Sequence, residues 1–321
     1  MATTRTTTAT MRALVPADGA DLLVQHADVP LPSPRADEAL VAVEAFSINR
    51  GETFLLERPP AGWRPGKDVA GRVLAPAADG SGPRAGERVV GHPPHSGWSE
   101  RVAVPVERLA ILPDAVETVA AAALPLAGLT ALRLLCACPP VAGRRLLITG
   151  ASGGVGHYVV ELATAVGAEV VAVSASARRG GRLAELGATV VHDVDDAEGL
   201  FDVVLESVGG DVLPRALGRL RRGGALVWFG QASREPVSLS FFSYFEQTGA
   251  TIRHFHYEDA DTPFAQDLAA LVRLVARGRL HPEVGVVADW SETAGVLRDL
   301  RDRAIRGNAV LRVASTDKET T

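Results

Sequence analysis

The stretch LLITGASGGVGHYVVELATAVGAEVVAVSASARR, residues 146–179, decides the fold of this chain. An apolar run leads into clustered glycines, a helical pattern follows, and a second apolar run comes next. Such apolar runs are typical of parallel strands covered on both faces, so the order predicts a βαβ unit. A glycine turn lets the backbone approach a pyrophosphate, and the helix N-terminus supplies N–H groups and a positive dipole end. We predict a dinucleotide site at residues 150–156; a structural turn without a ligand is the alternative.

The end of the second predicted strand indicates which dinucleotide binds. In a site that selects NAD, an acidic residue near this point binds the ribose 2′-hydroxyl. Here the chain offers hydroxyl and guanidinium groups instead, from Ser174, Ser176, Arg178 and Arg179. Such groups can bind a 2′-phosphate through charge-assisted hydrogen bonds. We therefore predict NADPH as the cofactor; the alternative is that the arginines are solvated residues in the first turn of a helix.

The rest of the chain indicates two domains, because its 321 residues exceed the ~250–300 at which a single core stops growing. Residues 11–112 carry short β-rich runs broken by Pro and Gly, which are typical of a compact all-β unit. From residue 145 onward, strands and helices alternate, which predicts a doubly wound parallel sheet. Its strands are expected at residues 145–150, 169–174, 188–193, 201–209 and 224–230. We expect this sheet to be inserted into the β unit, to which residues 307–313 return.

The composition excludes several classes of function. A net charge of −5 gives no reason to expect a nucleic-acid partner, and no apolar run reaches the ~18 residues that a membrane helix needs. Cys136 and Cys138 are too few for a disulfide framework and are interpreted as small buried hydrophobic residues. Residues 1–10 lack the core of a secretory signal and are predicted to be a disordered arm, and residues 315–321 a flexible tail. We expect a soluble cytoplasmic protein.

A series of short motifs along most of the chain carries a resemblance to a known family. The motifs are SINRGE, PGKDVAGRV, GERVVG, WSERVAVP, LPLAGLTAL, LLITGASGGVGH, LGATVVHD, ESVGG, GALVWFG and GNAVLRV. With them the sequence resembles the zinc-independent quinone oxidoreductase branch of the medium-chain dehydrogenase/reductases. The resemblance implies an α/β fold with a GroES-like β-barrel catalytic domain, residues 11–115 and 286–314, and an inserted Rossmann domain, residues 116–285. It also implies a homodimer.

The resemblance bears on metal binding as well. Zinc-using relatives carry a cysteine near the NRGE stretch and a histidine at the position of Lys67, and neither ligand is present here. Tetrahedral zinc needs three or four Cys, His or carboxylate ligands close together. His92 and His95 could form half of a metal site; a loop at a pocket rim or facing solvent is the favoured interpretation. We predict no catalytic zinc.

The resemblance also assigns cofactor contacts residue by residue. Asn49 is expected near the nicotinamide ribose, and Thr130 near the nicotinamide and its phosphates. The other expected contacts are Ser152, Gly153, Gly154, Val155, Gly156, His157, Ser207, Val208, Phe229, Gly230, Gln231 and Asn308. His192 or Asp193 stands where several NADPH-dependent relatives carry a tyrosine, and an acid at this point does not favour a 2′-phosphate.

Few residues are candidates for the chemistry itself. Lys67 could stabilise a developing oxyanion or donate a proton, although it could also be a lysine on the surface of the β domain. Asn49 is the second candidate, and Tyr244 is the second choice of proton donor. Phe54 stands where relatives often carry an active-site tyrosine, and a phenyl ring cannot donate a proton. The substrate pocket is expected to include Phe54, Trp63, His92, Phe241 and Phe242.

The aromatic residues between positions 241 and 257 allow two interpretations. They could wall a pocket for a planar substrate by stacking, or they could belong to a dimer-forming edge strand around TIRHFH. The favoured function is an NADPH-dependent, metal-free reductase of a small-molecule quinone or α,β-unsaturated carbonyl. The alternatives are an enoyl reductase that tailors a polycyclic secondary metabolite, and an NADPH-binding sensor or structural protein with little catalysis.

Overall fold

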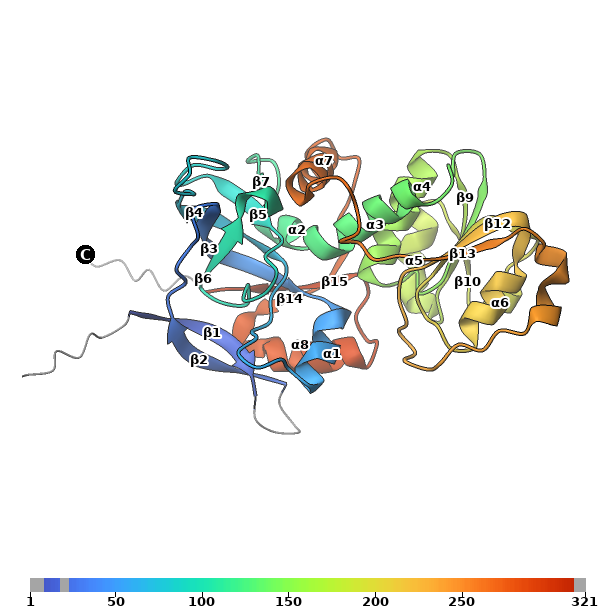
Figure 1. The fold of residues 1–321 in the computed structure, drawn as a ribbon, viewed down its shortest axis with the longest axis horizontal. Coiled ribbons are helices and arrows are strands. Elements are labelled where there is room, and N and C mark those ends of the chain that lie inside the picture. Colours follow the sequence, from blue (N-terminus) through green and yellow to red (C-terminus); the bar gives the residue numbers. More distant parts are fainter. Residues whose placement is uncertain (1–8, 18–22, 315–321) are drawn as a thin grey trace, which may run out of the picture. The chain divides into compact units, whose positions relative to one another are not determined.

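A computed structural model of the chain describes residues 9–17 and 23–314 (Figure 1). The chain divides into two compact units, one running to Leu126 and resuming at Thr262, the other formed by Ala127–Asp261. Most of the predicted arm and the whole predicted tail lie outside the described residues. Thr10, which was assigned to the arm, is instead the first residue of a strand, because it pairs with Pro30.

The contiguous unit, Ala127–Asp261, contains a six-stranded parallel sheet in the order β10-β9-β8-β11-β12-β13. Strands and helices alternate along the chain as the sequence predicts. The elements are β8 (Arg145–Ile148), α4 (Gly154–Ala165), β9 (Glu169–Val173), α5 (Ala177–Glu185), β10 (Thr189–Val191), η2 (Val194–Asp196), β11 (Phe201–Glu206), α6 (Val212–Gly218), β12 (Leu220–Trp228), η3 (Phe241–Gln247) and β13 (Thr251–His254). This is the doubly wound order in which the chain reverses direction across the sheet between β8 and β11.

The core of this unit forms because its central strands are apolar on successive residues. Leu147 on β8, Val204 on β11 and Leu226 on β12 are fully buried in one hydrophobic cluster with the helix α6 residues Leu213 and Leu217. Burial on both faces of a parallel sheet explains why these strands show no alternation of polar residues. The ends of the strands are thereby fixed in space, which positions the loops that follow them.

The interrupted unit carries the antiparallel part of the fold. Its strands are β1 (Thr10–Pro16), β2 (Val24–Pro30), β3 (Glu38–Ile48), β4 (Val69–Ala75), β5 (Arg88–Gly91), β6 (Arg101–Pro105), β7 (Leu109–Ile111), β14 (Val284–Asp289) and β15 (Asn308–Arg312). Its helices are α1 (Arg50–Glu57), η1 (Val106–Arg108), α2 (Thr118–Ala122), α7 (Phe264–Ala276), η4 (Trp290–Glu292) and α8 (Thr293–Arg301), and α3 (Pro125–Ala137) leads into the other unit. β1 and β2 form a separate hairpin.

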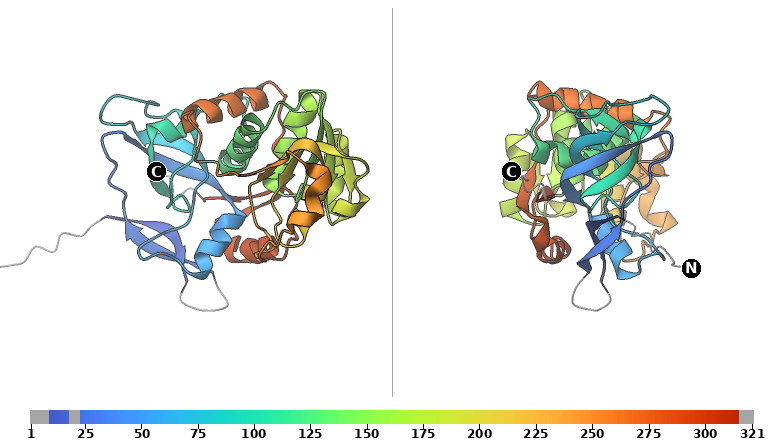
Figure 2. Two further views of the ribbon diagram at one scale, coloured as in Figure 1. Left: turned by 45° about the vertical axis from the view of Figure 1, so that its right-hand side comes forward. Right: turned by 90° about the vertical axis from the view of Figure 1, so that its left-hand side faces the viewer.

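A seven-stranded sheet in the order β14-β15-β3-β4-β5-β7 organises this unit, with β6 paired to β3. β15 lies antiparallel to β3, with Ala309 opposite Ile48 and Leu311 opposite Phe46. The predicted return of residues 307–313 to the β unit is therefore confirmed. Helices α1 and α8, which are far apart in the sequence, also lie side by side (Figure 2).

The boundaries between the units differ from those expected from the sequence, 115/116 and 285/286. The expected boundaries follow the change from β-rich to helical sequence, but helicity does not decide which core a helix joins. Helix α2 packs against β3 and β4, and helix α7 packs against β7 and η1, so both belong to the interrupted unit.

The two cysteines behave differently from each other. Cys138 is buried, as predicted, and burial raises the pKa of its thiol to about 11. Cys136 is exposed, so its prediction as a buried residue is wrong. Side chains two positions apart at a helix end point to different faces, which explains the difference.

Within residues 9–17 and 23–314, none of the helices combines the length and the apolar character needed to cross a membrane.

Candidate functional site

The turn between β8 and α4 is shaped by its glycines. Gly150 has a φ of +62°, in the left-handed region that favours glycine. A Cβ at Gly156 would lie 2.1 Å from the carbonyl oxygen of Ala151, so no larger residue fits there. The N-cap of α4 is Gly153, and no side chain caps this helix end. The first N–H groups of a helix have no acceptor within the helix, so they are available to an anion.

The turn lies at the point where the order of the strands reverses. β8 pairs with β9 on one side and with β11 on the other. A Cβ at Gly150 would lie 2.7 Å from Oγ of Ser207, so the residues after β8 and β11 are in contact. The hydroxyl of Ser207 donates to the carbonyl of Thr149 (3.1 Å). Ligands of doubly wound sheets bind outside the carboxyl ends of the strands at such a point.

The segment after β9 carries the predicted 2′-phosphate contacts. Ser176 is the N-cap of α5, Arg178 is exposed and Arg179 is partly exposed. Ser174 is buried, and its hydroxyl donates to the carbonyl of Ser176 (3.1 Å). A phosphate needs a donor, and the Ser174 proton is already engaged in the turn. The structure therefore does not support Ser174 as a phosphate ligand, whereas Ser176 and both arginines stay at the surface of this loop.

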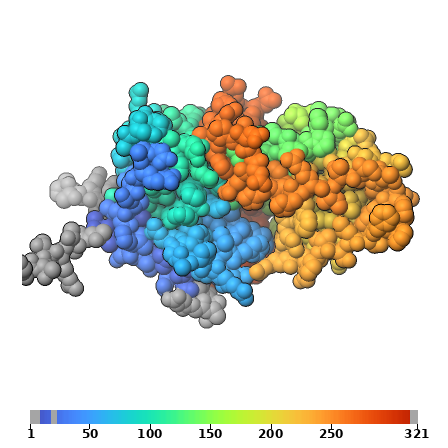
Figure 3. All heavy atoms as spheres, in the orientation of Figure 1, coloured from blue at the N-terminus to red at the C-terminus, as the bar shows by residue number. Residues whose placement is uncertain are grey.

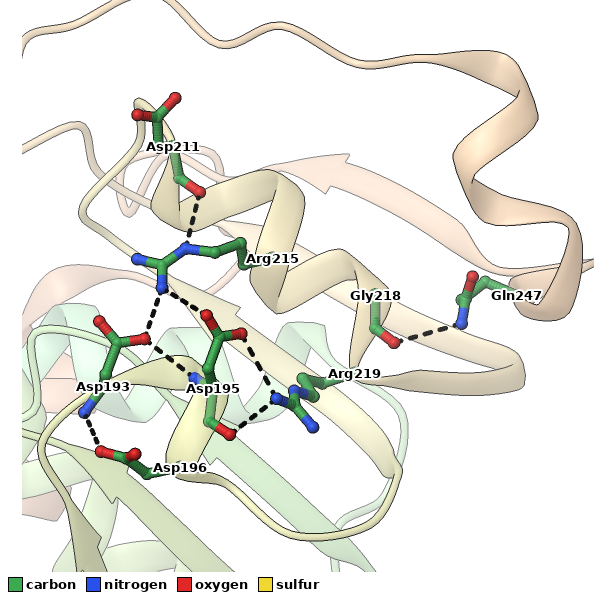
Figure 4. A network of polar contacts seen from close by, with 8 residues as sticks. All are labelled: Asp193, Asp195, Asp196, Asp211, Arg215, Gly218, Arg219 and Gln247. Carbon is green, nitrogen blue, oxygen red and sulfur yellow. Dashed lines mark hydrogen bonds and ion pairs between the residues drawn. The ribbon is translucent and has the colours of Figure 1, made fainter.

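Asp193, the acid after β10, is held in a network with two arginines (Figure 4). Its Oδ1 accepts from the N–H of Asp195 (2.9 Å) and from Nη1 of Arg215 (2.5 Å). Arg215 also donates to Asp195 (2.9 Å), and Arg219 donates to the carbonyl of Asp195 (2.9 Å). The Asp195 hydrogen bond, with Arg215 adding to it, lowers the pKa of Asp193. The negative charge that disfavours a 2′-phosphate is therefore paired inside this unit.

Glu206, at the end of β11, is a buried carboxyl that the sequence reasoning missed. It accepts from the backbone N–H of Val208 (2.7 Å) and of Gly209 (3.1 Å), and from the hydroxyl of Thr149 (3.0 Å). Burial raises the pKa of Glu206 against the effect of these bonds. It fixes the loop that presents Ser207 beside the glycine turn. The sequence signal for this role was an acid that ends an apolar strand and is followed by SVGG.

Thr130 on α3 has an unsatisfied hydroxyl. The residue is buried, and its Oγ1 has no hydrogen-bond partner among the described residues. Buried hydroxyls are normally hydrogen-bonded, so this one points to a ligand that completes it. The site predicted for the nicotinamide end of the cofactor fits this observation. His157 lies inside the first turn of α4, where its Nδ1 is 2.9 Å from the carbonyl of Gly153.

The loop after β12 is held by its own contacts. The N–H of Phe229 donates to the carbonyl of Glu206 (2.9 Å), which continues the pairing of β12 with β11. Nε1 of Trp228 donates to the carbonyl of Gly230 (2.6 Å), and Gln231 donates from its amide to Glu235 (2.7 Å). The predicted contacts after β8, β9, β11 and β12 therefore gather at one edge of the parallel sheet.

In the other unit, Glu52 joins the segments that carry Asn49 and Lys67. Its carboxyl accepts from the backbone N–H groups of Asn49 (3.0 Å), Gly66 (2.8 Å) and Lys67 (3.2 Å). Glu52 is buried, and burial raises its pKa to about 8. The Lys67 side chain is only partly exposed. The structure thus brings the two catalytic candidates of this unit together around one carboxyl.

Asp68, the residue after Lys67, belongs to the same cluster. It is fully buried and accepts from the hydroxyl of Ser47 (2.7 Å), the amide of Asn49 (2.7 Å) and the backbone N–H of Leu126 (3.0 Å). Nδ1 of His92 lies 3.1 Å from Oδ1 of Asp68, the oxygen that also accepts from Leu126. The Asn49 amide therefore has a fixed orientation, which the sequence alone could not show.

The comparisons with known proteins agree over most of the chain. The family described as zinc-binding dehydrogenase matches residues 154–277. The quinone oxidoreductase of Sus scrofa is 26% identical over 313 residues, which are 91% of this chain and 94% of that one. The chloroplast envelope quinone oxidoreductase homolog of Arabidopsis thaliana is 36% identical over 197 residues, 55% of this chain and 58% of that one.

A solved structure covers the whole architecture. The native structure of mycobacterial Rv1454c complexed with NADPH matches 94% of this chain and 100% of its own, with a TM-score of 0.84 and 25% identity. Over most of its length the chain is therefore similar to quinone oxidoreductases and to a structure solved with NADPH. The resemblance predicted from the motifs is confirmed, as is the α/β fold with a Rossmann-like parallel sheet and a separate sheet that is mainly antiparallel.

The expected substrate pocket of this quinone oxidoreductase-like chain is only partly supported. His92 has no exposed surface, so its prediction at a pocket rim or facing solvent is wrong; its ring lies against Phe264 and Asp68. Trp63 packs on the hydrophobic core of its unit, and Phe54 is partly buried on α1. Asn308 begins β15 and donates from its amide to the carbonyl of Glu283 (3.1 Å).

The predicted aromatic wall is exposed rather than enclosing. Phe241 and Phe242 are 78% and 76% exposed, and Phe241 contacts Phe242 and Phe245 through ring edges. The orange atoms of this part of the chain lie on the surface at the right of Figure 3. Within its own unit the segment therefore forms no pocket wall, and the pocket prediction for Phe241 and Phe242 is not supported.

Tyr244 is engaged within the parallel-sheet unit. Its ring packs on the core of the parallel-sheet unit, and its hydroxyl donates to the carbonyl of Pro214 (3.3 Å). Burial raises the pKa of this hydroxyl. The role of Tyr244 as a proton donor stays a prediction.

The residues that could hold zinc do not fit that metal. Lys67 stands where the resemblance places a zinc ligand, and the amide of nearby Asn49 is bound to Asp68. Among residues 9–17 and 23–314, no group of three His, Cys, Asp or Glu side chains is placed to hold a metal ion.

Proposed function

We propose that this chain is an NADPH-dependent oxidoreductase that delivers a hydride to a quinone or another α,β-unsaturated carbonyl, without zinc. The observation that carries the proposal is the glycine turn at the strand reversal, followed by a β9 end that presents Ser176, Arg178 and Arg179. The similarity to quinone oxidoreductases, and to a structure solved with NADPH, supports the same proposed function. Quinones and enones form one substrate class here because both contain a carbonyl conjugated to a double bond.

The chain's own residues would hold the cofactor in three places. The uncapped N-terminus of α4 binds the pyrophosphate, and Gly156 leaves room for its approach. Arg178 and Arg179 bind the 2′-phosphate, with charge-assisted bonds. The unsatisfied Thr130 hydroxyl completes its hydrogen bonding on the nicotinamide side. NADPH supplies the hydride when bound, and the protein supplies position and charge.

Lys67 is the residue proposed to act on the substrate. Hydride delivery to the β-carbon of an enone leaves an enolate, and delivery to a quinone leaves a hydroquinone anion. Either charge needs a hydrogen-bond donor that is positioned in advance. The Lys67 ammonium is partly shielded, and its backbone is anchored by Glu52. Asn49, whose amide is oriented by Asp68, is proposed to position the nicotinamide ribose.

The assembly proposed is a homodimer formed through β13. This strand is the last in the parallel sheet, and all four of its residues are exposed. An exposed edge strand offers a row of unpaired N–H and C=O groups to a second copy. The polycyclic-substrate alternative depended on an aromatic pocket wall, and the exposure of Phe241 and Phe242 gives it no support.

The test is a titration of the purified chain with NADPH and with NADH, followed by turnover on a panel of quinones and enones. The double substitution of Arg178 and Arg179 by Ala is expected to weaken NADPH binding by about tenfold or more and NADH binding only slightly. An equal loss for both cofactors would show that the arginines do not read the 2′-phosphate. Binding of NADPH without turnover of any substrate would contradict the reductase assignment.

A further inference from the structure

A cavity of about 290 Å³ lies in the interrupted unit. It is lined by three arginines, one histidine and one acid, with small and apolar residues between them. The charged and polar lining residues are Arg35, Glu38, Arg64, His95, Ser96 and Arg101. Neither the cofactor contacts nor the Lys67 chemistry proposed above uses this cavity.

Two of the three arginines of the cavity are not balanced by acids. Arg35 pairs with Glu38 (3.2 Å) and with Asp37 (3.4 Å). Within the described residues, neither Arg64 nor Arg101 forms an ion pair or a side-chain hydrogen bond, and Nη1 of Arg64 is buried without a partner. Two arginines without counter-ions among the described residues therefore line one cavity. A buried donor without an acceptor costs free energy, so such a group is expected to have a ligand.

The local contacts hold these groups in place. The N–H of Ser96 donates to the carbonyl of Arg64 (3.0 Å), which ties the two loops of the cavity together. Ser96 has a φ of +68°, a conformation that non-glycine residues rarely adopt. Nδ1 of His95 lies 2.7 Å from the Ser96 hydroxyl. The cavity is thus built by defined backbone contacts between residues 64–66 and 96–98.

The lining combines burial with positive charge around His95. Burial lowers the pKa of Arg64. Burial, followed by the charge of Arg64, lowers the pKa of His95, and Glu38 opposes this effect only partly. Lys67 adds to the lowering, so the cavity lies within electrostatic reach of the residue proposed to stabilise the oxyanion.

We propose that the cavity lined by Arg64, Arg101 and His95 is an anion subsite that binds a phosphate group. Two uncompensated guanidinium groups match the charge of a phosphate monoester, and their planar forks match the geometry of its oxygens. Arg64 precedes Lys67 by three residues in the same loop. We therefore assign the phosphate to the substrate on which Lys67 is proposed to act. This last step rests on the proposed function, whereas the binding of phosphate does not.

The first experiment is a calorimetric titration of the full chain with inorganic phosphate, with and without saturating NADPH. Saturable binding is expected, weakened about tenfold or more by R101A or R101E and by R64A. Arg101 is exposed, so its variants test the subsite even if R64A fails to fold. R277A, which removes an exposed arginine of the same unit, is the matched control and should bind as the unmodified chain does. Equal binding by R101E and R277A would overturn the subsite.

The second experiment separates free phosphate from substrate phosphate. Two enones that differ only in a terminal phosphate monoester are compared by their kcat/KM with NADPH. The phosphorylated enone is expected to be favoured, and R101A is expected to reduce that preference about tenfold. Phosphate binding without a kinetic preference would overturn the assignment to the substrate. Failure of both enones to react would contradict the proposed function, while the calorimetry would still decide the subsite.

Discussion

Glu52 shows how one residue can link stability to pH in this chain. Burial raises its pKa to about 8 in the folded protein, above the ordinary value of 4.5. Between these values the folded chain holds a proton that the unfolded chain releases. Stability from this residue is therefore full below about pH 4.5 and declines as the pH rises through about 8. The decline follows from the cost of a buried carboxylate charge.

The substitution Glu52→Gln is expected to remove this part of the pH dependence. The amide oxygen can keep the bonds from Gly66 and Lys67, but the amide nitrogen would face the N–H of Asn49. The unfolding free energy, measured by urea denaturation from pH 5 to pH 9, should fall less steeply in the variant. Parallel curves for the two proteins would show that Glu52 does not titrate in this range.

At the scale of single residues, the sequence predicts a role correctly only where that role depends on neighbours along the chain. The glycine turn and Arg178 and Arg179 belong to this group, because a strand before and a helix after fix their position. The burial of His92 and Ser174 could not be predicted, since it depends on residues that only the folded chain brings near. Asp68 and Phe264, which surround His92, are 24 and 172 positions away from it.

The start of α4 is the element on which the cofactor proposal depends. Gly156→Ala would place a methyl group against the Ala151 carbonyl at 2.1 Å, so the turn must move. NADPH binding is expected to weaken strongly, and the unfolding midpoint to fall. Gly181→Ala, on the exposed side of α5 where a Cβ meets nothing within 4 Å, is the control. It should stabilise the chain by about 0.5–1 kcal/mol, because alanine favours the helix over glycine.

Strand β13 is the element proposed to form the dimer. Ile252 is 45% exposed on this edge strand, and Val166, which is 55% exposed, lies elsewhere in the same unit. Ile252→Lys is expected to convert the dimer into a monomer, because charged residues on an edge oppose pairing. Val166→Lys should leave the mass unchanged. Analytical ultracentrifugation measures both, and an unaltered mass for Ile252→Lys would rule out β13 as the interface.

The sequence predicts the helices and strands themselves better than it predicts which other elements they pack against. The successive apolar residues of β8, β9 and β11 predict buried parallel strands. Helices α2 and α7 are equally visible as helical patterns, but their apolar faces do not reveal which core they join. The same limit applies to the aromatic segment at η3, whose composition fits a pocket wall or a surface equally well.

For the molecule as a whole, β15 joins β14 to β3 in the sheet of the interrupted unit. Leu311 is fully buried in its core, and its neighbour Arg312 is exposed. Leu311→Ala is expected to reduce the unfolding free energy by about 2–5 kcal/mol, because it leaves a cavity between β14 and β3. Arg312→Ala should change it by less than about 0.5 kcal/mol. Similar urea midpoints for the two variants would contradict this role of β15.

The pairing of β15 with β3 also has a consequence for the synthesis of the protein on the ribosome. Residues 127–261 are contiguous, so the parallel sheet can complete itself while later codons are still being translated. β6 covers residues 38–42 of β3, but the segment of residues 45–48 in this early strand waits for Asn308–Arg312, some 260 positions later, before it is paired on that side. Until then its exposed backbone can pair wrongly with other chains. We expect the nascent chain to need protection at β3 rather than at the glycine turn between β8 and α4.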